Sequence, residues 1–322
     1  MHTISPPLIE CVPNFSEGRN KNTIDQIVQS IESVPGVKVL HNDMGYDTHR
    51  TVITFAGDKI ACKEASYRSI LSAFQLIDMT LHHGTHPRLG AVDVFPFVPL
   101  RGYTMQDAID CSVDVAKRIA DEFSIPVYLY NQSAKVEDRK SLANVRRGEY
   151  EGLNEKLMTP EGKPDYGPAV FNPHIGALTI GARKILLAFN FNLNTTDTVM
   201  AKKIASALRE KNGGLKSVRA IGWFIPEFKC AQVSANFIDL DHTPLHIAFE
   251  ACNKLAVQFG AKVTGSELVG LIPLKSLLDT TDYFYKTNNF SQEYKVEKAV
   301  EILGLNTVKR FSAVERVIEW LV

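Results

Sequence analysis

The sequence lacks an excess of charge of either sign and contains few cysteines. Its 322 residues include 36 lysines and arginines against 36 aspartates and glutamates. Proteins that bind nucleic acid through phosphates normally carry a basic excess, so this class is disfavoured, and any anionic ligand must be held by local groups. The five cysteines are scattered and never form a CxxC pair. This pattern argues against a disulfide framework or a thiolate zinc site and favours reduced thiols in the cytoplasm.

Long apolar segments and the common nucleotide and hydrolase motifs are also missing. No run approaches the roughly 18 apolar residues that a membrane-spanning helix needs, and the N-terminus lacks the basic flank and apolar run of a signal peptide. GxGxxG after a strand, GxxxxGK[ST] and GxSxG do not occur. The sequence therefore gives no support for a membrane protein, a dinucleotide-dependent dehydrogenase, a kinase or a serine hydrolase.

Hydrophobic periodicity predicts the same order of elements in both halves of the chain. Strand-like runs and helical stripes follow one another as βαββαβ, the order of a ferredoxin-like domain. The predicted strands are residues 8–12, 37–43, 51–56 and 92–100 in the first half, and 184–193, 218–225, 230–238 and 262–271 in the second. We therefore predict an α+β fold of two ferredoxin-like (βαββαβ) subdomains.

Local signals refine this prediction. The first half continues with an extra helix, whose start at Thr104 and Asp107 matches a capping box, and with a strand at 127–129. In the second half we expect Thr195 or Thr196 to cap the first helix and Thr243 to cap the second.

Two polar or flexible segments leave alternatives open. Residues 159–177 are rich in Pro and Gly but also hold Tyr166, Val170 and Phe171, which a solvated linker would not usually carry. Such a segment is either a surface linker or a ligand-binding loop. The segment 14–19 (NFSEGR) either binds a substrate carboxylate or forms the turn before a helix.

The densest polar cluster is LHHGTHPRLGAVD, with three histidines at His82, His83 and His86. Zinc binding through a helical i, i+4 pair is disfavoured, because Gly84 and Pro87 oppose a helix and no HExxH is present. General acid–base catalysis and three exposed loop histidines both remain possible. His86 is the best placed for catalysis, because Pro87 restricts its backbone to an extended geometry before a strand.

Neutral amides alternate with apolar residues along two predicted strands. Asn190, Asn192 and Asn194 share one face of the first strand of the second half, and Gln232, Ser234 and Asn236 share one face of the third. In a ferredoxin-like sheet these two strands are central and adjacent, so the apolar face packs on helices and the amide face looks outward. That outward face is either a solvated surface or a hydrogen-bonding pocket.

Six motifs in a fixed order resemble the glutamate formimidoyltransferase family. They are ECVPNFSEGR (10–19), HPRLGAVDVFPFVP (86–99), PVYLY (126–130), DYGP…GA…GARK (165–184), AFNFNL (188–193) and GSELVGLIPLKSLLD (265–279). The match runs from about residue 8 to the C-terminus. The resemblance implies two ferredoxin-like subdomains, residues 1–184 and 185–322, packed with a cleft between them and usually dimeric. It also implies the stand-alone form, without the cyclodeaminase domain that is fused to the animal enzymes.

The resemblance further implies an activity. The family moves a formimino group between N-formimino-L-glutamate and tetrahydrofolate, in histidine degradation and one-carbon metabolism. We therefore expect a cytoplasmic, homodimeric transferase with small-molecule substrates, with tetrahydrofolate as co-substrate, and with no metal, no redox cofactor, no nucleic acid and no membrane partner. N-formylglutamate as the donor, with formyl transfer, and a non-catalytic folate-binding protein are the alternatives.

Functional residues follow from the motifs. The family's catalytic histidine corresponds to His86, and the aspartate that could orient or stabilise its imidazole corresponds to Asp43. A single imidazole of near-neutral pKa could take a proton from the attacking nitrogen and return one to the departing amine. The amide pattern adds Asn190, Asn192 and Gln232 as side chains that line the substrate cleft. The folate-binding segment corresponds to residues 167–176, namely Gly167, Pro168, Ala169, Val170, Phe171, Asn172, Pro173, His174, Ile175 and Gly176.

Overall fold

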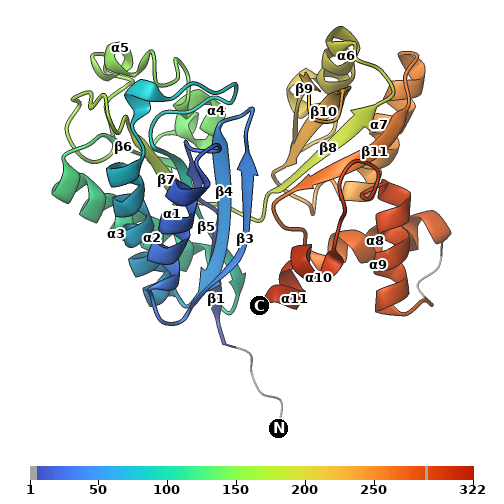
Figure 1. Cartoon of the computed structure of the whole chain (residues 1–322), viewed down its shortest axis with the longest axis horizontal. Coiled ribbons are helices and arrows are strands. Elements are labelled where there is room, and N and C mark those ends of the chain that lie inside the picture. Colours follow the sequence, from blue (N-terminus) through green and yellow to red (C-terminus); the bar gives the residue numbers. More distant parts are fainter. Residues whose placement is uncertain (1–5, 287–288) are drawn as a thin grey trace. The chain divides into compact units, whose positions relative to one another are not determined.

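The computed structural model describes residues 6–286 and 289–322. The chain folds into two compact units, Met1–Lys184 (unit 1) and Ile185–Val322 (unit 2). Each unit has its own sheet, as Figure 1 shows, and its own hydrophobic core. Within the described ranges, no helix combines the length and the apolar character that a membrane span requires.

Unit 1 is built on a seven-stranded sheet. β1 and β2 follow one another between β4 and β5 and are antiparallel to both, while β3 pairs with the outer side of β4. This is the strand order of the predicted ferredoxin-like unit. β7 then adds in parallel to β5, and β6 in parallel to β7. The strands are β1 (Leu8–Cys11), β2 (Asn14–Phe15), β3 (Val37–Gly45), β4 (Arg50–Gly57), β5 (Val92–Arg101), β6 (Val127–Asn131) and β7 (Leu178–Ala182).

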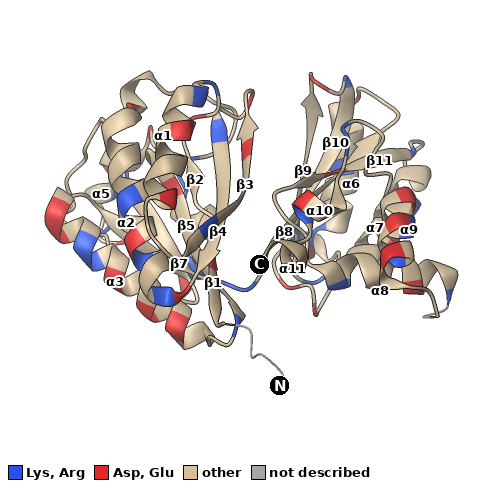
Figure 2. Ribbon diagram, turned by 60° about the horizontal axis from the view of Figure 1, so that its bottom comes forward, with Lys and Arg blue, Asp and Glu red and all other residues tan. Residues whose placement is uncertain are grey.

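Three helices cover one face of this sheet: α1 (Lys21–Glu32), α2 (Lys59–Leu76) and α3 (Met105–Phe123). The apolar stripe of α1 (Ile24, Ile27, Ile31) is buried against Phe55 and other strand residues of the main core. The capping box of α3 is confirmed, since Asp107 N donates to Thr104 Oγ1 (3.2 Å) and Thr104 N donates to the Asp107 carboxylate (2.9 Å). Charged residues of both signs are spread over the outer sides of the helices, as Figure 2 shows.

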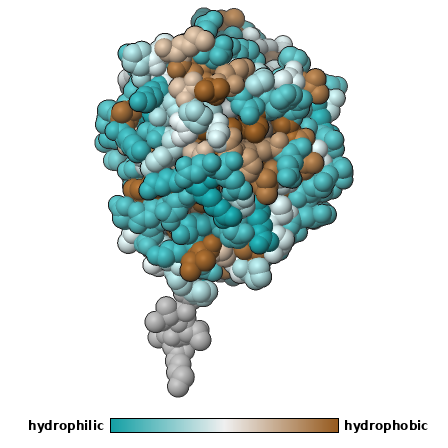
Figure 3. Space-filling model, turned by 90° about the vertical axis from the view of Figure 1, so that its left-hand side faces the viewer, coloured by the Kyte–Doolittle hydropathy of each residue, from teal (hydrophilic) through white to brown (hydrophobic). Residues whose placement is uncertain are grey.

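A smaller core lies away from these helices, and it is the part of unit 1 that positions the candidate site. Leu89, Val94, Tyr128 and Val145 belong to it. The connecting segment there holds η2 (Glu137–Lys140), α4 (Leu142–Val145) and α5 (Leu153–Leu157), and η1 (Met79–Leu81) follows α2. In the view of Figure 3 the surface is mainly hydrophilic, with smaller hydrophobic areas between the polar residues.

Unit 2 confirms the predicted βαββαβ order and forms a four-stranded antiparallel sheet in the order β11-β8-β10-β9. Its elements are β8 (Leu187–Leu193), α6 (Thr198–Leu208), η3 (Glu210–Asn212), β9 (Val218–Ile225), β10 (Cys230–Phe237), α7 (Leu245–Gln258) and β11 (Val263–Val269). Four further helices follow, which the sequence pattern did not predict: α8 (Leu274–Tyr285), α9 (Gln292–Leu303), α10 (Ala313–Arg316) and α11 (Ile318–Leu321).

Both predicted helix caps of unit 2 are wrong. Asp197, not Thr195 or Thr196, caps α6, since its carboxylate accepts from Val199 N (2.8 Å). Pro244 stands at the N-cap of α7, and the Thr243 hydroxyl instead donates to Lys216 O (2.6 Å). In both cases several capping-type residues or a proline lie within two positions, and sequence alone does not decide between them.

Candidate active site

His86 lies half-buried on the loop that leads into β5 of unit 1. Its Nδ1 is 2.8 Å from Pro87 O, so Nδ1 carries the proton and Nε2 carries the lone pair. The guanidinium of Arg50, at the start of β4, lies against the same ring, with Nη1 2.7 Å from Nδ1 and in closer contact with Nε2. A donor from Arg50 therefore faces the nitrogen that would have to accept a proton.

Arg50 is itself held by Asn14 of β2. Arg50 Nε donates to Asn14 Oδ1 at 2.9 Å, and Nη2 contacts the same oxygen. Asn14 Nδ2 in turn donates to Val12 O (3.1 Å). The segment 14–19 thus contributes a side chain that orients a cation at the site, a role that neither of the two sequence alternatives included.

A second guanidinium stands near His86. Arg146, which follows α4, pairs with the fully buried carboxylate of Asp93, with Nε 3.1 Å from Oδ1 and Nη2 in contact with Oδ2. Burial, and after it the positive charges of Arg50 and Arg146, lower the pKa of His86 to about 2. In this arrangement of side chains the imidazole is therefore held in its neutral form, whereas the acid–base role calls for a near-neutral pKa.

Asp43 lies on the same sheet face as the groups that hold His86. It stands opposite Val52 on β4, and Val52 stands opposite Asn14 on β2, so these three side chains share a row and a face. Arg50, two residues before Val52, points to that face as well. The Asp43 carboxylate is 4.0 Å from His41 Nε2. The fold thus brings Asp43, Arg50 and Asn14 to one face, although Asn14 lies 36 positions before Arg50 in the sequence.

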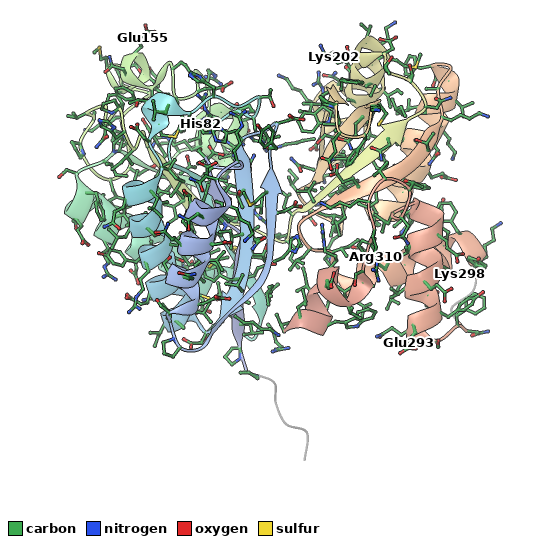
Figure 4. All side chains as sticks on the ribbon, viewed as in Figure 1. His82, Glu155, Lys202, Glu293, Lys298 and Arg310 are labelled. Atoms are coloured by element: carbon green, nitrogen blue, oxygen red, sulfur yellow. The ribbon has the colours of Figure 1, made fainter. Side chains whose placement is uncertain are left out.

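His82 has a different environment from His86. It is buried at the end of the unit where α4 lies (Figure 4), and Arg88 Nε donates to its Nδ1 (3.1 Å) while its Nε2 donates to His49 O (2.8 Å). Arg88 also forms a bidentate pair with Glu151 at 2.6 and 2.7 Å. Both ring nitrogens of His82 are thus engaged in holding the loop, and His83 is exposed. Among the residues that the structure describes, no group of three or more His, Cys, Asp or Glu is placed to hold a metal ion.

The segment 167–176 is anchored at its C-terminal end, beside the loop of His86. Asn172 Oδ1 accepts from the backbone N–H groups of His174 (3.0 Å) and Ile175 (3.1 Å), forming an Asx turn. Ala91 N donates to Ile175 O (2.8 Å), and Gly176 bridges to Gly90. Gly176 has φ +75°, and a Cβ there would meet Leu89 O at 2.3 Å, so this junction needs glycine.

The first part of the same segment is exposed. Residues 167–170 lie open to solvent, and Val170 is 62% exposed. The ring of Phe171 packs on Tyr150 with centroids 5.5 Å apart, and Tyr150 Oη donates to Pro173 O (2.5 Å). An exposed apolar stretch joined to a rigid turn, which is itself bonded to the segment that follows His86, is suited to contact a ligand with an apolar part.

The amide pattern of unit 2 has the predicted phase but not the predicted exposure. Phe189, Phe191 and Val233 pack in the core, so the amides point to the opposite face of the sheet. Asn190, Asn192 and Gln232 are nevertheless only 0–4% exposed. Asn236 and Asn194, near the ends of their strands, are exposed.

These three amides bond to one another and to two residues that the sequence pattern missed. Gln232 Oε1 accepts from Trp223 Nε1 (2.7 Å), while Gln232 Nε2 donates to Asn192 Oδ1 (2.8 Å) and to Glu267 Oε2 (3.0 Å). Asn190 Nδ2 donates to the same carboxylate oxygen at 3.0 Å. Trp223 stands opposite Gln232, and Glu267 opposite Asn190, so only the strand register reveals them. Within the described residues, the buried Asn192 Nδ2 has no hydrogen-bond partner.

Comparison with known proteins identifies the class. Residues 8–183 match the model of the formiminotransferase domain, N-terminal subdomain, and residues 188–322 match the model of the formiminotransferase domain. The chain therefore belongs to the formiminotransferase family, which confirms the resemblance seen in the motifs.

The relatives are of two lengths. The chain is 45% identical over 98% of its residues to the formimidoyltransferase-cyclodeaminase of Sus scrofa, but it spans only 60% of that protein. It is 40% identical to a glutamate formimidoyltransferase of Streptococcus pyogenes, with 90% of this chain and 97% of the relative covered. A glutamate formimidoyltransferase of Thermoplasma acidophilum is 41% identical, with 92% and 99% covered.

Proposed function

We propose that the protein is a glutamate formimidoyltransferase, which moves the formimino group of N-formimino-L-glutamate to tetrahydrofolate and gives 5-formiminotetrahydrofolate and L-glutamate. The observation that carries the proposal is the family match along both subdomains, with relatives of the same name covered over nearly their whole length. The reaction would serve histidine degradation and one-carbon metabolism.

His86 is the proposed acid–base residue. N5 of tetrahydrofolate attacks the amidine carbon, a new C–N5 bond forms, and His86 Nε2 takes the N5 proton. The bond between the central carbon of the tetrahedral intermediate and the glutamate nitrogen then breaks. His86 returns the proton to that nitrogen as it leaves. Positioned acid–base groups typically contribute about 10²–10⁴-fold, and holding two substrates in register contributes at least as much. Asp43, which lies on the same sheet face as Arg50 and Asn14, would stabilise the positive charge that develops on the imidazole of His86.

Substrate binding is proposed for two regions. Residues 167–176 would bind the folate, a role supported by their exposed apolar start and by their anchored end beside the His86 loop. Asn190, Asn192 and Gln232 would contribute amide groups to substrate, a role supported by the buried donor Asn192 Nδ2.

No metal or redox cofactor enters the proposed chemistry, because group transfer between two nitrogens needs only proton movement. The proposal includes a cytoplasmic location and a homodimeric state for the protein. The five free thiols are compatible with a reducing compartment.

Turnover tests the proposal directly. The protein is mixed with tetrahydrofolate and either N-formimino-L-glutamate or N-formyl-L-glutamate, and the methenyl-folate absorbance is read after acidification. We expect turnover with the formimino donor. If only the formyl donor is turned over, the protein is instead a formyltransferase. Folate binding without turnover of either donor would identify a non-catalytic folate-binding protein.

A further inference from the structure

Arg50 occupies the position from which His86 would have to act. Its Nη1 contacts the lone-pair nitrogen of the imidazole, while Nδ1 is engaged with Pro87 O. A guanidinium carries five donors and no acceptor, and it stays charged under ordinary conditions. In this arrangement neither ring nitrogen of His86 can accept a proton from a substrate. One of the two side chains has to move before catalysis.

The charges around the site indicate which side chain moves. Arg146 is neutralised by Asp93, which is its buried partner. The hydrogen bonds of Arg50 in the described part of the chain go to Asn14 and His86, which are both neutral. A half-buried guanidinium without a carboxylate is poorly compensated, and a carboxylate that binds it in bidentate fashion is the strongest partner available to it.

We propose that Arg50 binds a carboxylate of the glutamate donor, and that this same movement uncovers Nε2 of His86. The inference rests on the proposed function, because the donor is an amino acid with two carboxylates. It adds a binding residue and an order of events: the donor must be bound before His86 can take the proton from N5. Without donor, His86 is covered and inert as a base.

Two charged groups act on His86, namely Arg50 from β4 and Arg146 from the segment after α4. Asp93 from β5 acts on Arg50, and Asp43 of β3 lies on the same sheet face as Arg50. Only Arg50 changes partner in this scheme. When a carboxylate pairs with Arg50, the positive charge against the imidazole is reduced, and the basicity of His86 rises while donor is present.

The first experiment needs no turnover. The imidazole of His86 is titrated by NMR with and without L-glutamate, the product of the proposed reaction, and the pKa is compared between wild type, Arg50→Gln and Arg50→Lys. In wild type, saturating L-glutamate should raise the pKa of His86 by about one unit or more. In Arg50→Gln that pKa should already be raised without ligand, and L-glutamate should bind about tenfold or more weakly. An unchanged titration in wild type, or unimpaired binding in Arg50→Gln, would overturn the proposal.

Kinetics supply the second readout. Arg50→Gln should raise KM for the formimino donor about tenfold or more with little change in KM for tetrahydrofolate, and Arg50→Lys should restore part of the loss. Arg101→Gln, at the far end of β5, is the matched control. Equal increases in both KM values together with a lower melting temperature would show a structural role and refute the inference. If wild type does not turn over the donor, the proposed function fails, while the NMR titration still decides on Arg50.

Discussion

At the scale of single residues, the two histidines of the HPR loop show how neighbours decide chemistry. His86 and His82 are four residues apart, yet they differ in their neighbours. Within the described residues, His86 contacts an arginine whose side-chain hydrogen bonds go to neutral groups, whereas both nitrogens of His82 bond to groups that fix the loop. The loop sequence contains neither Arg50 nor His49. The division of roles between the two histidines is therefore a product of tertiary structure.

Replacing His86 tests its proposed role. His86→Ala should lower kcat by about 10²–10⁴-fold, because the proton of N5 loses its acceptor and the departing nitrogen loses its donor. Folate binding, measured by fluorescence titration, should be nearly intact. A correctly folded variant that loses less than about tenfold in kcat would remove His86 from this role.

Replacing His82 should act on stability instead. His82→Ala leaves the buried guanidinium edge of Arg88 and the carbonyl of His49 without their partner, which should cost about 1–3 kcal/mol of unfolding free energy. The folded fraction should keep kcat within about tenfold of wild type. His83→Ala, on the same loop but exposed, is the control and should change neither quantity. A loss of kcat as large as that of His86→Ala, without a drop in melting temperature, would contradict this assignment.

Sequence reasoning could propose the His86 loop and the segment 167–176 because each is a contiguous motif. It did not predict that Arg50, Asn14, Asp93 and Arg146 surround the candidate site. Arg50 meets His86 across 36 positions, and Arg146 meets Asp93 across 53. Such pairs are set by strand register and loop packing, which periodicity does not encode.

At the scale of elements, period-two alternation gave the correct phase of β8 and β10 but not the exposure of their amide face. The phase of a strand, meaning which of its side chains face the core, follows from which side chains are apolar. The core of unit 2 confirms the predicted phase of both strands. Exposure depends on neighbouring strands: Trp223 on β9 and Glu267 on β11 bond to the amides.

β7, which pairs with β5 in unit 1, was missed by the sequence pattern for a related reason. It is buried along its whole length, and it contains Gly181, where a Cβ would meet Tyr130 O at 2.2 Å.

The burial of this face changes what a mutation should do. Gln232→Ala leaves Trp223 Nε1 without its acceptor and removes the two hydrogen bonds that Gln232 Nε2 donates to Asn192 and Glu267. We therefore expect a loss of about 1–3 kcal/mol in unfolding free energy. If this face were fully solvated, Gln232→Ala would cost almost no unfolding free energy. Asn236→Ala, on the same strand and exposed, is the control. Asn192→Ala should weaken substrate binding by about 0.5–2 kcal/mol, because it removes the donor that has no internal partner. A Gln232→Ala variant with the wild-type unfolding curve would show that the network contributes nothing.

At the scale of the whole molecule, each unit has an independent core. The periodicity of the sequence predicted the four-stranded sheet of unit 2 and the βαββαβ part of the sheet of unit 1, but not β7. The C-terminal helices α8–α11 were not predicted, although α8 and α9 contribute Leu277, Val296 and Leu303 to the core of unit 2. Once the sixth element of a βαββαβ order is complete, the pattern gives no rule for the residues that come after β11, and only packing places them.

Metal dependence can be tested on the intact protein. Because both nitrogens of His82 are hydrogen-bonded and no ligand cluster occurs in the described residues, we expect activity to survive exhaustive chelation. Elemental analysis of the purified protein should find no stoichiometric zinc. Reversible loss of activity on chelation, with recovery on adding zinc, would contradict this expectation and point back to the histidine cluster.

Stability of the whole chain should fall as the pH drops from about 7 to 5. Burial holds the pKa of His82 below its usual range, helped by the charges of His49 and Arg88, and burial likewise lowers the pKa of His86 and His246. Below the ordinary histidine pKa of about 6.5 the unfolded chain therefore binds protons that the folded chain does not. Each such histidine lowers the unfolding free energy by up to about 1.4 kcal/mol per pH unit in this window.

Urea unfolding at pH 8, 6.5 and 5.5 measures this dependence before carboxylates begin to titrate. The lowered pKa values of Glu17, Asp78 and Glu151 add a further loss only as the pH falls through about 4.5. His82→Gln keeps an acceptor and a donor at the buried position but removes the titration, so its stability should fall less between pH 8 and 5.5. His83→Gln, on the exposed neighbour, should keep the full wild-type slope. If wild type is equally stable at pH 8 and 5.5, or if His82→Gln has an unchanged slope, the buried histidines are not what destabilises the fold in acid.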